Sequence, residues 1–448
     1  MAAAPKPDFR EIDRKVMKTL EWPGPRYWIW VGSLFLIIAW GAACWTRQIY
    51  LGLGVTGLRQ PNMWAIYITD FVFWVGIAHS GTLISAILFL FRSRWRTAVY
   101  RTAETMTAFA VLTAGLFPLI HLGRVWFFYW LLPYPNQRWL QPDFRSPLVW
   151  DAFAVSTYLT VSILFLFIGL IPDVATARDQ SRGWRRVFYG ALALGWQGSD
   201  DQWRHFAGLY LLLAGLATPL VISVHSVVSW DFAMAQLPGW HSTIFAPYFV
   251  AGAIFSGCAM VLTLMIPLRR MLDLEDLITP WHLDNLARIV LFTSLIVSYS
   301  YITESFMVWY AHDPFETTTF HWRYFGPYGF LFWIMVFCNC AVPLPLFSPR
   351  VRRNLKLLWV LSLFVNVGMW LERFVIIAGS QATNFVPSQW GFYVPSVTEI
   401  SITAGSFAWF LMLFSLFTRF LPIVSMTELK EGLGWLRQAL RKESAEAA

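Results

Sequence analysis

Ionisable side chains at the junction of two apolar segments are the strongest chemical signal in this sequence. His121 and Arg124 lie near the end of one apolar segment, and Asp151 lies at the start of the next. An ionisable group inside a hydrophobic segment is costly, so each is by default a candidate for function. His121 and Arg124 are three residues apart and would share a helix face. Tyr158, seven residues after Asp151, would face the same way as Asp151.

A further carboxylate, Asp231, ends a later apolar segment. A carboxylate near a histidine in an apolar pocket suits reversible proton transfer, because burial and pairing adjust the proton affinity of both groups. Oxidation of a quinol releases protons with its electrons and also needs an apolar cleft for the ring and tail. His121, Asp151 and Asp231 therefore predict a quinol site, walled by the aromatic residues of 126–130 and by Trp150.

The sequence motifs supply no electron acceptor. The four cysteines have neither the spacing of an iron–sulfur cluster nor a CxxCH haem attachment. The histidines 79, 121 and 225 form no obvious haem-ligand set, although ligation by two histidines from different helices stays open. We expect no metal site, haem or iron–sulfur cluster in this chain, so that electrons would leave through a partner.

Other ionisable groups in apolar segments are candidates for a transmembrane proton route, and each has a structural alternative. The candidates are Asp70, His79, His225, Glu304 and Glu372. Asp70 could lie at the membrane interface. Glu372 could pair with the adjacent Arg373, and His225 could be a core histidine bonded to a carbonyl; for these two the structural interpretation is favoured.

The elements that must position these groups are membrane-spanning helices. Of the 448 residues, 57% are hydrophobic and 13% are charged, whereas a soluble protein has about 25% charged residues. About ten apolar runs reach the roughly 20 residues that span a bilayer. They are 27–47, 64–91, 102–130, 148–172, 206–230, 243–268, 285–310, 325–347, 355–377 and 396–421. Prolines 118 and 219 are the expected mid-span breaks.

Basic residues fix the expected orientation. Lys and Arg are concentrated in alternate connections and in the tails 1–26 and 422–448, whereas connections 231–242 and 378–395 contain neither. Both termini should therefore be cytoplasmic. The net charge of +8 follows from this topology and does not indicate a nucleic-acid partner. The polar N-terminal tail argues against a cleavable signal peptide, and the C-terminal tail fits either a short surface helix or a solvated segment.

An internal similarity suggests how the helices are grouped. The sequence GIAHSGTL at 76–83 returns as GAIFSGCA at 252–259, and both runs leave into basic loops. The two runs should point the same way, which predicts a parallel repeat of four-helix bundles at 64–230 and 243–377, flanked by the first and tenth helices. Ser-Gly pairs would let the backbones approach closely. Chance similarity between apolar segments is the alternative.

Three segments resemble the NrfD/PsrC family of membrane subunits: WAIYITDFVFWVGIAHSGTLISAIL at 64–88, FPLIHLGRVW at 117–126, and YPNQR with SPLVWD over 134–151. They are most like the alternative complex III branch and its ActC-type subunits, and the resemblance covers most of the chain. It implies ten helices in two four-helix bundles and a place in the bacterial inner membrane. It also implies a multisubunit menaquinol oxidase with c-type haem subunits, a periplasmic iron–sulfur subunit and a sister NrfD-like subunit.

By motif position, His121, Asp151 and Asp231 fall where the resemblance implies a menaquinol site, Asp231 with the least distinctive surroundings. His121 would accept a hydroxyl proton, Asp151 would orient His121 or relay the proton, and Asp231 would be the second acceptor. Arg124 would stabilise an anionic semiquinone.

Two rival functions stay open. A sister, ActF-type subunit would be structural or proton-conducting, without a quinol site. A secondary transporter would also have many helices and buried charges, but its site would lie near the midplane between inverted repeats.

Overall fold

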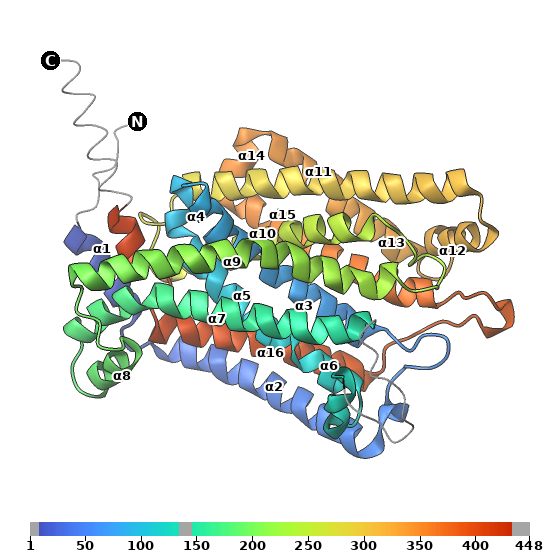
Figure 1. Ribbon diagram of the computed structural model, residues 1–448, viewed down its shortest axis with the longest axis horizontal. Helices are drawn as coiled ribbons and strands as arrows, with labels where there is room; N and C mark the ends of the chain where they lie inside the picture. The colour runs from blue at the N-terminus through green and yellow to red at the C-terminus, as the bar shows by residue number, and fades with distance from the viewer. Residues whose placement is uncertain (1–8, 134–145, 432–448) are drawn as a thin grey trace.

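The chain forms a bundle of long helices that run side by side (Figure 1). The computed structural model describes residues 9–133 and 146–431. Ten helical segments in this part are long and apolar enough to cross a membrane, which confirms an all-helical, polytopic membrane protein. They are α2 (Pro25–Leu51), α3 with its continuation (Ile66–Leu90), α5 with α6 (Tyr100–His121), α7 (Pro147–Gln180), α9 (Asp200–Ala233), α10 (Phe245–Met271), α11 (Pro280–Ala311), α13 with its continuation (Gly329–Phe347), α15 with its continuation (Leu355–Gly379) and α16 (Val397–Phe420).

The third span differs most from its predicted extent. Its first part, α5, ends at Ala114, and α6 begins at Leu116. Pro118 explains this break, because it cannot donate to the carbonyl of Ala114 and its ring crowds that carbonyl. The span then ends at His121, well before residue 130, and the chain turns at Gly123, where φ is +73°. Glycine adopts this left-handed conformation without a Cβ penalty.

Pro219 does not break its helix, so that expectation was wrong. The helix α9 continues from Asp200 to Ala233 through the proline. The neighbouring Thr218 hydroxyl donates to the carbonyl of Ala214 at 2.8 Å. The carbonyl that Pro219 leaves without its helical donor is the next one, that of Gly215.

The internal similarity lies at the centre of the bundle, where α3 packs against α5 and α10. A Cβ added to Gly257 of α10 would overlap the Ser80 side chain and the Ile77 carbonyl of α3. A Cβ added to Gly81 would likewise overlap Thr107 of α5. Small residues therefore bring three helix backbones close together. The division into two four-helix bundles stays a prediction.

The bundle has two distinct ends. One end, here called the basic end, is formed by α1 (Phe9–Thr19), α8 (Trp184–Leu192) and residues 421–431 (Figure 1). The other, the far end, is formed by the start of α7, the end of α9 and α12 (Pro314–Phe325) (Figure 1).

The described part of the C-terminal tail is packed on the bundle and is not a solvated segment. Residues 426–431 are helical. Thr427 donates through its backbone N–H to Asp173 at 3.0 Å, and Arg96 donates to both Glu428 carboxylate oxygens at 2.6 Å. Lys430 donates to Asp13 at 2.7 Å. We call these contacts of Thr427, Glu428 and Lys430 the C-terminal clasp.

Candidate functional site

Two of the predicted acids meet at the far end. Asp151 lies in the first turns of α7 and Asp231 near the end of α9, and their carboxyl groups are in direct side-chain contact. The adjacent Trp150 and Trp230 also meet, with ring centroids 6.0 Å apart. Asp151 is 6% exposed. We call Asp151 and Asp231 the acid pair; ionising both carboxyl groups at once is unfavourable, because two like charges in contact repel each other.

His121 is the last residue of α6 and is half-buried. Hydrogen bonds to the preceding residue hold the backbone at His121 in place. The Gln48 amide donates to the Ile120 carbonyl at 2.7 Å, and the Tyr67 hydroxyl donates to Gln48 at 2.6 Å. Within the described residues, no hydrogen bond or ion pair joins His121 to the acid pair.

Three polar atoms of the predicted site are buried without a hydrogen-bond partner in the described structure. They are Nδ1 of His121 and one carboxylate oxygen each of Asp151 and Asp231. Buried polar atoms are normally paired, so a group of unpaired ones needs an explanation such as a ligand or water. The two oxygens belong to acids that contact each other, whereas no contact in the described structure brings His121 to them.

The aromatic wall expected for this site is not formed. Residues Val125–Leu131 form a 3-10 helix on the surface. Trp126, Phe128 and Trp130 are 53%, 51% and 52% exposed, and Arg124 is exposed as well. The chain turns outward at Gly123, so these side chains do not continue the helix face of His121. The YPNQR motif lies outside the described residues.

Tyr158 belongs to a separate cluster in the middle of the bundle. It lies two turns beyond Asp151, which is about 10 Å along the helix axis. Its hydroxyl donates to the Ala78 carbonyl at 2.9 Å, and its ring stacks on His79 with centroids 4.9 Å apart. The His225 ring follows at 4.6 Å from His79. We call Tyr158, His79 and His225 the central cluster.

The two histidines of the central cluster differ in their bonding. His79 donates through Nδ1 to the Val75 carbonyl at 2.5 Å, while its Nε2 has no partner in the described structure. Neither ring nitrogen of His225 has a partner there. The expectation that His225 is bonded to a carbonyl was therefore wrong; its ring packs beside the rings of His79 and Phe249 instead.

The remaining proton-route candidates are satisfied by neighbours. Asp70 is fully buried inside the chain and accepts hydrogen bonds from Trp370 at 2.8 Å and from Thr403 at 2.6 Å. Glu304 pairs with Arg323 at 3.0 Å. Glu372 contacts Arg373, as expected for an ion pair, and also accepts from Tyr301.

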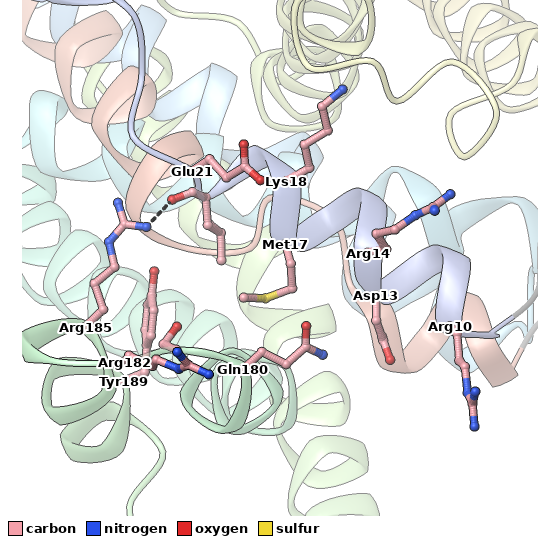
Figure 2. A pocket seen from close by; sticks show the side chains of 12 residues that line it. Arg10, Asp13, Arg14, Met17, Lys18, Glu21, Gln180, Arg182, Arg185 and Tyr189 are labelled. Carbon is pink, nitrogen blue, oxygen red and sulfur yellow. Dashed lines mark hydrogen bonds between the residues drawn. The ribbon is translucent and has the colours of Figure 1, made fainter.

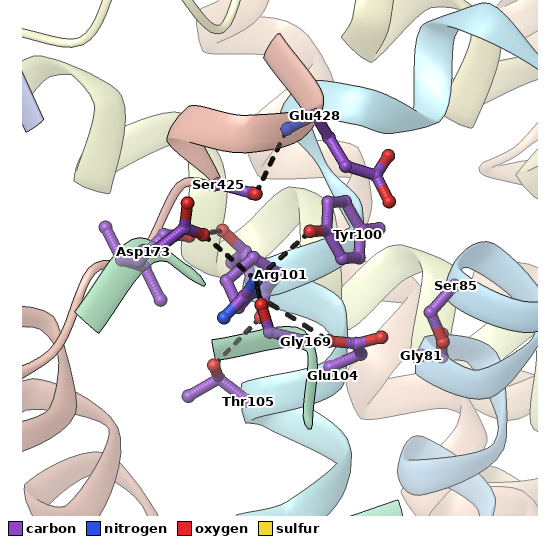
Figure 3. Close-up of polar contacts among 12 residues, drawn as sticks. Gly81, Ser85, Tyr100, Arg101, Glu104, Thr105, Gly169, Asp173, Ser425 and Glu428 are labelled. Atoms are coloured by element: carbon purple, nitrogen blue, oxygen red, sulfur yellow. Dashed lines mark hydrogen bonds and ion pairs between the residues drawn. The ribbon is translucent and has the colours of Figure 1, made fainter. Parts of the chain in front are cut away.

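One buried ionic group was missed. Arg101 was assigned to a basic connection, yet it lies in α5, 1% exposed, and contacts Asp173 at 3.1 Å (Figure 3). Glu104 lies one turn away from Arg101, at 3.9 Å, and accepts from Tyr210 at 3.3 Å. We call these four residues the Arg101 cluster. The signal that could have found it is the acid three residues after the arginine, inside an apolar run.

No three or more His, Cys, Asp or Glu side chains gather at a possible metal site within residues 9–133 and 146–431.

Comparison with known proteins gives consistent matches along most of the chain. Residues 54–386 match the family described as "Polysulphide reductase, NrfD". The chain is 27% identical over 422 residues to a putative membrane subunit of dimethyl sulfoxide reductase from Halobacterium salinarum, covering 88% of this chain and 91% of that one. It is 20% identical over 334 residues to the Hdr-like menaquinol oxidoreductase integral membrane subunit of Archaeoglobus fulgidus, covering 73% of each. It is 21% identical over 425 residues to the menaquinone reductase integral membrane subunit of Nitratidesulfovibrio vulgaris, covering 89% and 92%.

Proposed function

From the premise that this chain belongs to the NrfD family of membrane subunits, we propose that it is the part of a multisubunit oxidoreductase that oxidises menaquinol. Relatives named as menaquinol oxidoreductase and menaquinone reductase subunits support a menaquinone as the substrate class. The single observation that carries the proposal is the contact at the far end between the buried Asp151 and the half-buried Asp231, each with one buried oxygen that has no hydrogen-bond partner in the described structure.

In the proposed reaction, each hydroxyl of the quinol loses a proton to a group of this chain. The buried Nδ1 of His121 accepts one, and the ionised oxygen of the acid pair accepts the other. The two electrons pass to a partner subunit, so the ring leaves as a quinone. The acid pair suits this role because a shared proton can be replaced or released without leaving an isolated buried charge. Arg124, exposed beside His121, contributes positive charge near the site.

The assembly around the chain is proposed from the sequence resemblance. The basic end faces the cytoplasm of a bacterium, as its Arg-rich connections suggest, and the far end faces the periplasm. An iron–sulfur subunit sits over the far end and passes electrons to c-type haem subunits, as in alternative complex III with an ActC-type subunit. A sister NrfD-like subunit forms the rest of the membrane part.

We also propose a proton route through the bundle. The central cluster lies between the acid pair at the far end and the Arg101 cluster toward the other end, and it includes a histidine with no hydrogen-bond partner in the described structure. The buried ion pairs of Glu304 with Arg323 and of Glu372 with Arg373, together with Asp70, would extend the proton route between the other helices. Reversible protonation of His79 or His225 would link the segments.

The alternatives make different predictions. A secondary transporter would purify without redox partners, and family membership favours a redox-complex subunit over it. A structural or proton-conducting, ActF-type subunit would purify with haem and iron–sulfur absorbance but would not bind a quinol analogue.

The direct test of the quinol site is Asp151→Asn in the purified assembly. The amide keeps the shape of the side chain but cannot share a proton with Asp231. We expect quinol oxidation to fall on the order of 100-fold, with all subunits still present in the assembly. Asp179→Asn, an exposed acid near the other end of the same helix, is the matched control and should keep full activity. Full quinol oxidation by an intact Asp151→Asn assembly would remove the acid pair from the mechanism.

A further inference from the structure

A basic cavity lies at the basic end, remote from the acid pair. It has a volume of about 600 Å³ and lies between α1 on one side and the end of α7 with the start of α8 on the other. Figure 2 shows Met17 and Asp13 pointing from α1 toward the side where Gln180, Arg182 and Tyr189 lie. The cavity joins two segments that are far apart in the sequence.

The walls of this cavity carry an excess of positive charge. Five cationic side chains line it, against the two acids Asp13 and Glu21. The cations are Arg10, Arg14, Lys18, Arg182 and Arg185. Asp13 is already engaged by Lys430 of the C-terminal clasp at 2.7 Å. Lys18 pairs with Asp273 at 3.0 Å, and no ion pair of Arg10, Arg14 or Arg182 is found within the described part of the chain. Figure 2 shows Arg10 and Arg14 extending from α1 away from Arg182, so an anion bound between the two walls would have to draw these side chains together.

The surface beside the cavity is apolar and faces outward. On α8, Trp184 is 59% exposed and Val187 74% exposed, while Arg185 points back and donates to the Leu20 carbonyl at 2.7 Å. Trp22 is 64% exposed and its ring lies 5.5 Å from that of Trp28 at the start of α2. Tryptophans at the ends of spans and a short helix with one apolar face are typical of the membrane interface.

We propose that this cavity binds the phosphate headgroup of an anionic phospholipid from the leaflet at the basic end. Guanidinium groups pair with phosphate oxygens through two parallel hydrogen bonds, and basic pockets at this depth suit anionic headgroups. The acyl chains would lie along Trp22, Trp28 and the apolar face of α8. A soluble phosphate would use the same arginines but would leave this apolar surface unused, so the lipid is the occupant that fits both features.

The bound headgroup would have a structural effect as well. It would bridge α1 to the turn between α7 and α8, beside the clasp residue Lys430. This inference does not rest on the proposed quinol chemistry, since the acid pair lies at the opposite end of the bundle.

The test is lipid binding by the purified assembly, measured by native mass spectrometry after exchange into detergent and addition of defined lipids. We expect phosphatidylglycerol to bind more tightly than phosphatidylcholine, and millimolar inorganic phosphate not to displace it. Arg14→Gln with Arg182→Gln removes one arginine from each wall and should weaken phosphatidylglycerol binding roughly tenfold or more. Arg26→Gln with Arg186→Gln removes the same charge from nearby exposed positions outside the cavity and should change binding less than twofold.

Three outcomes would overturn the proposal. Equal weakening by the two double variants would show general attraction to positive charge. Displacement by inorganic phosphate would show a site for a soluble anion. Equal binding of the two lipids would show that headgroup charge is not recognised. The last two comparisons use the unaltered chain, so they decide the question even if the cavity variant does not assemble.

Discussion

At the scale of single residues, the surroundings of each ionisable group depend on its burial and on its hydrogen-bond or ion-pair partners. The sequence predicts the burial but not the partners. The types and positions of His121, Asp151 and Asp231 predict a common site, and the structure brings Asp151 and Asp231 into contact. The contact between Asp151 and Asp231 was not predictable, because it depends on how α7 and α9 are rotated against each other. The hydrogen-bond donors to Asp70 were not predictable for the same reason, because Trp370 and Thr403 come from distant segments.

A residue-scale prediction concerns the glycine at the centre of the bundle. Gly257→Ala places a methyl group against Ser80 and the Ile77 carbonyl, so α3 and α10 must separate. We expect a loss of about 1–3 kcal/mol in stability, typical of an overpacked core. The measurement is the thermal unfolding midpoint of the purified assembly.

The matched control for this change is Gly215→Ala in α9. No heavy atom outside the neighbouring backbone lies within 4 Å of an added Cβ there. Its midpoint should stay the same or rise slightly, because alanine favours a helix over glycine. An equal fall for the two variants would contradict the close approach at Gly257.

At the scale of elements, hydropathy located every span but not the interruptions within them. Three spans contain π-helical turns, at Leu83–Ile87, Phe337–Ala341 and Val375–Gly379, and no residue type signals these in the sequence. Proline gave one correct break, at Pro118, and one wrong one, since α9 continues through Pro219. The early end of the third span at His121 followed from Gly123, which the apolar composition of 125–131 concealed.

The element-scale prediction tests whether the break at Pro118 positions His121. Pro118→Ala should let α5 and α6 join into one helix and rotate His121 away from its present place. A small displacement of a reacting group costs on the order of 10²-fold in rate, so we expect quinol oxidation to fall at least tenfold. Pro219→Ala, in an unbroken helix, should leave the rate within about twofold of the original. Retention of full activity by Pro118→Ala would show that the break does not serve the site.

At the scale of the whole molecule, composition alone predicted the fold class, since few charged residues and long apolar runs allow little besides a helical membrane bundle. The arrangement of polar groups along the length of the bundle was not predictable. By sequence, Arg101 and Asp173 lie in connections between predicted spans, and only the packing of the helices brings them together as a buried ion pair. The acid pair, the central cluster and the Arg101 cluster together give the bundle buried polar groups at three levels.

The molecule-scale prediction concerns proton movement through these levels. His79→Ala removes the ring between Tyr158 and His225 while leaving the acid pair in place. In vesicles containing the assembly, we expect quinol oxidation to continue and the number of protons translocated per electron to fall. Ser223→Ala, an exposed position on α9, is the control. An unchanged ratio in His79→Ala would count against a route through the central cluster.

The C-terminal clasp has a consequence for biogenesis. Arg96 precedes the third span and Asp173 lies in the fourth, yet their partners Glu428 and Thr427 are synthesised only after α16. While the ribosome is still making the later spans, Arg96 lacks the carboxylate of Glu428, and Asp173, which Arg101 of the third span already neutralises, lacks the hydrogen bond from Thr427. The contacts of the clasp with the early helices can therefore form only after translation has passed the last helix.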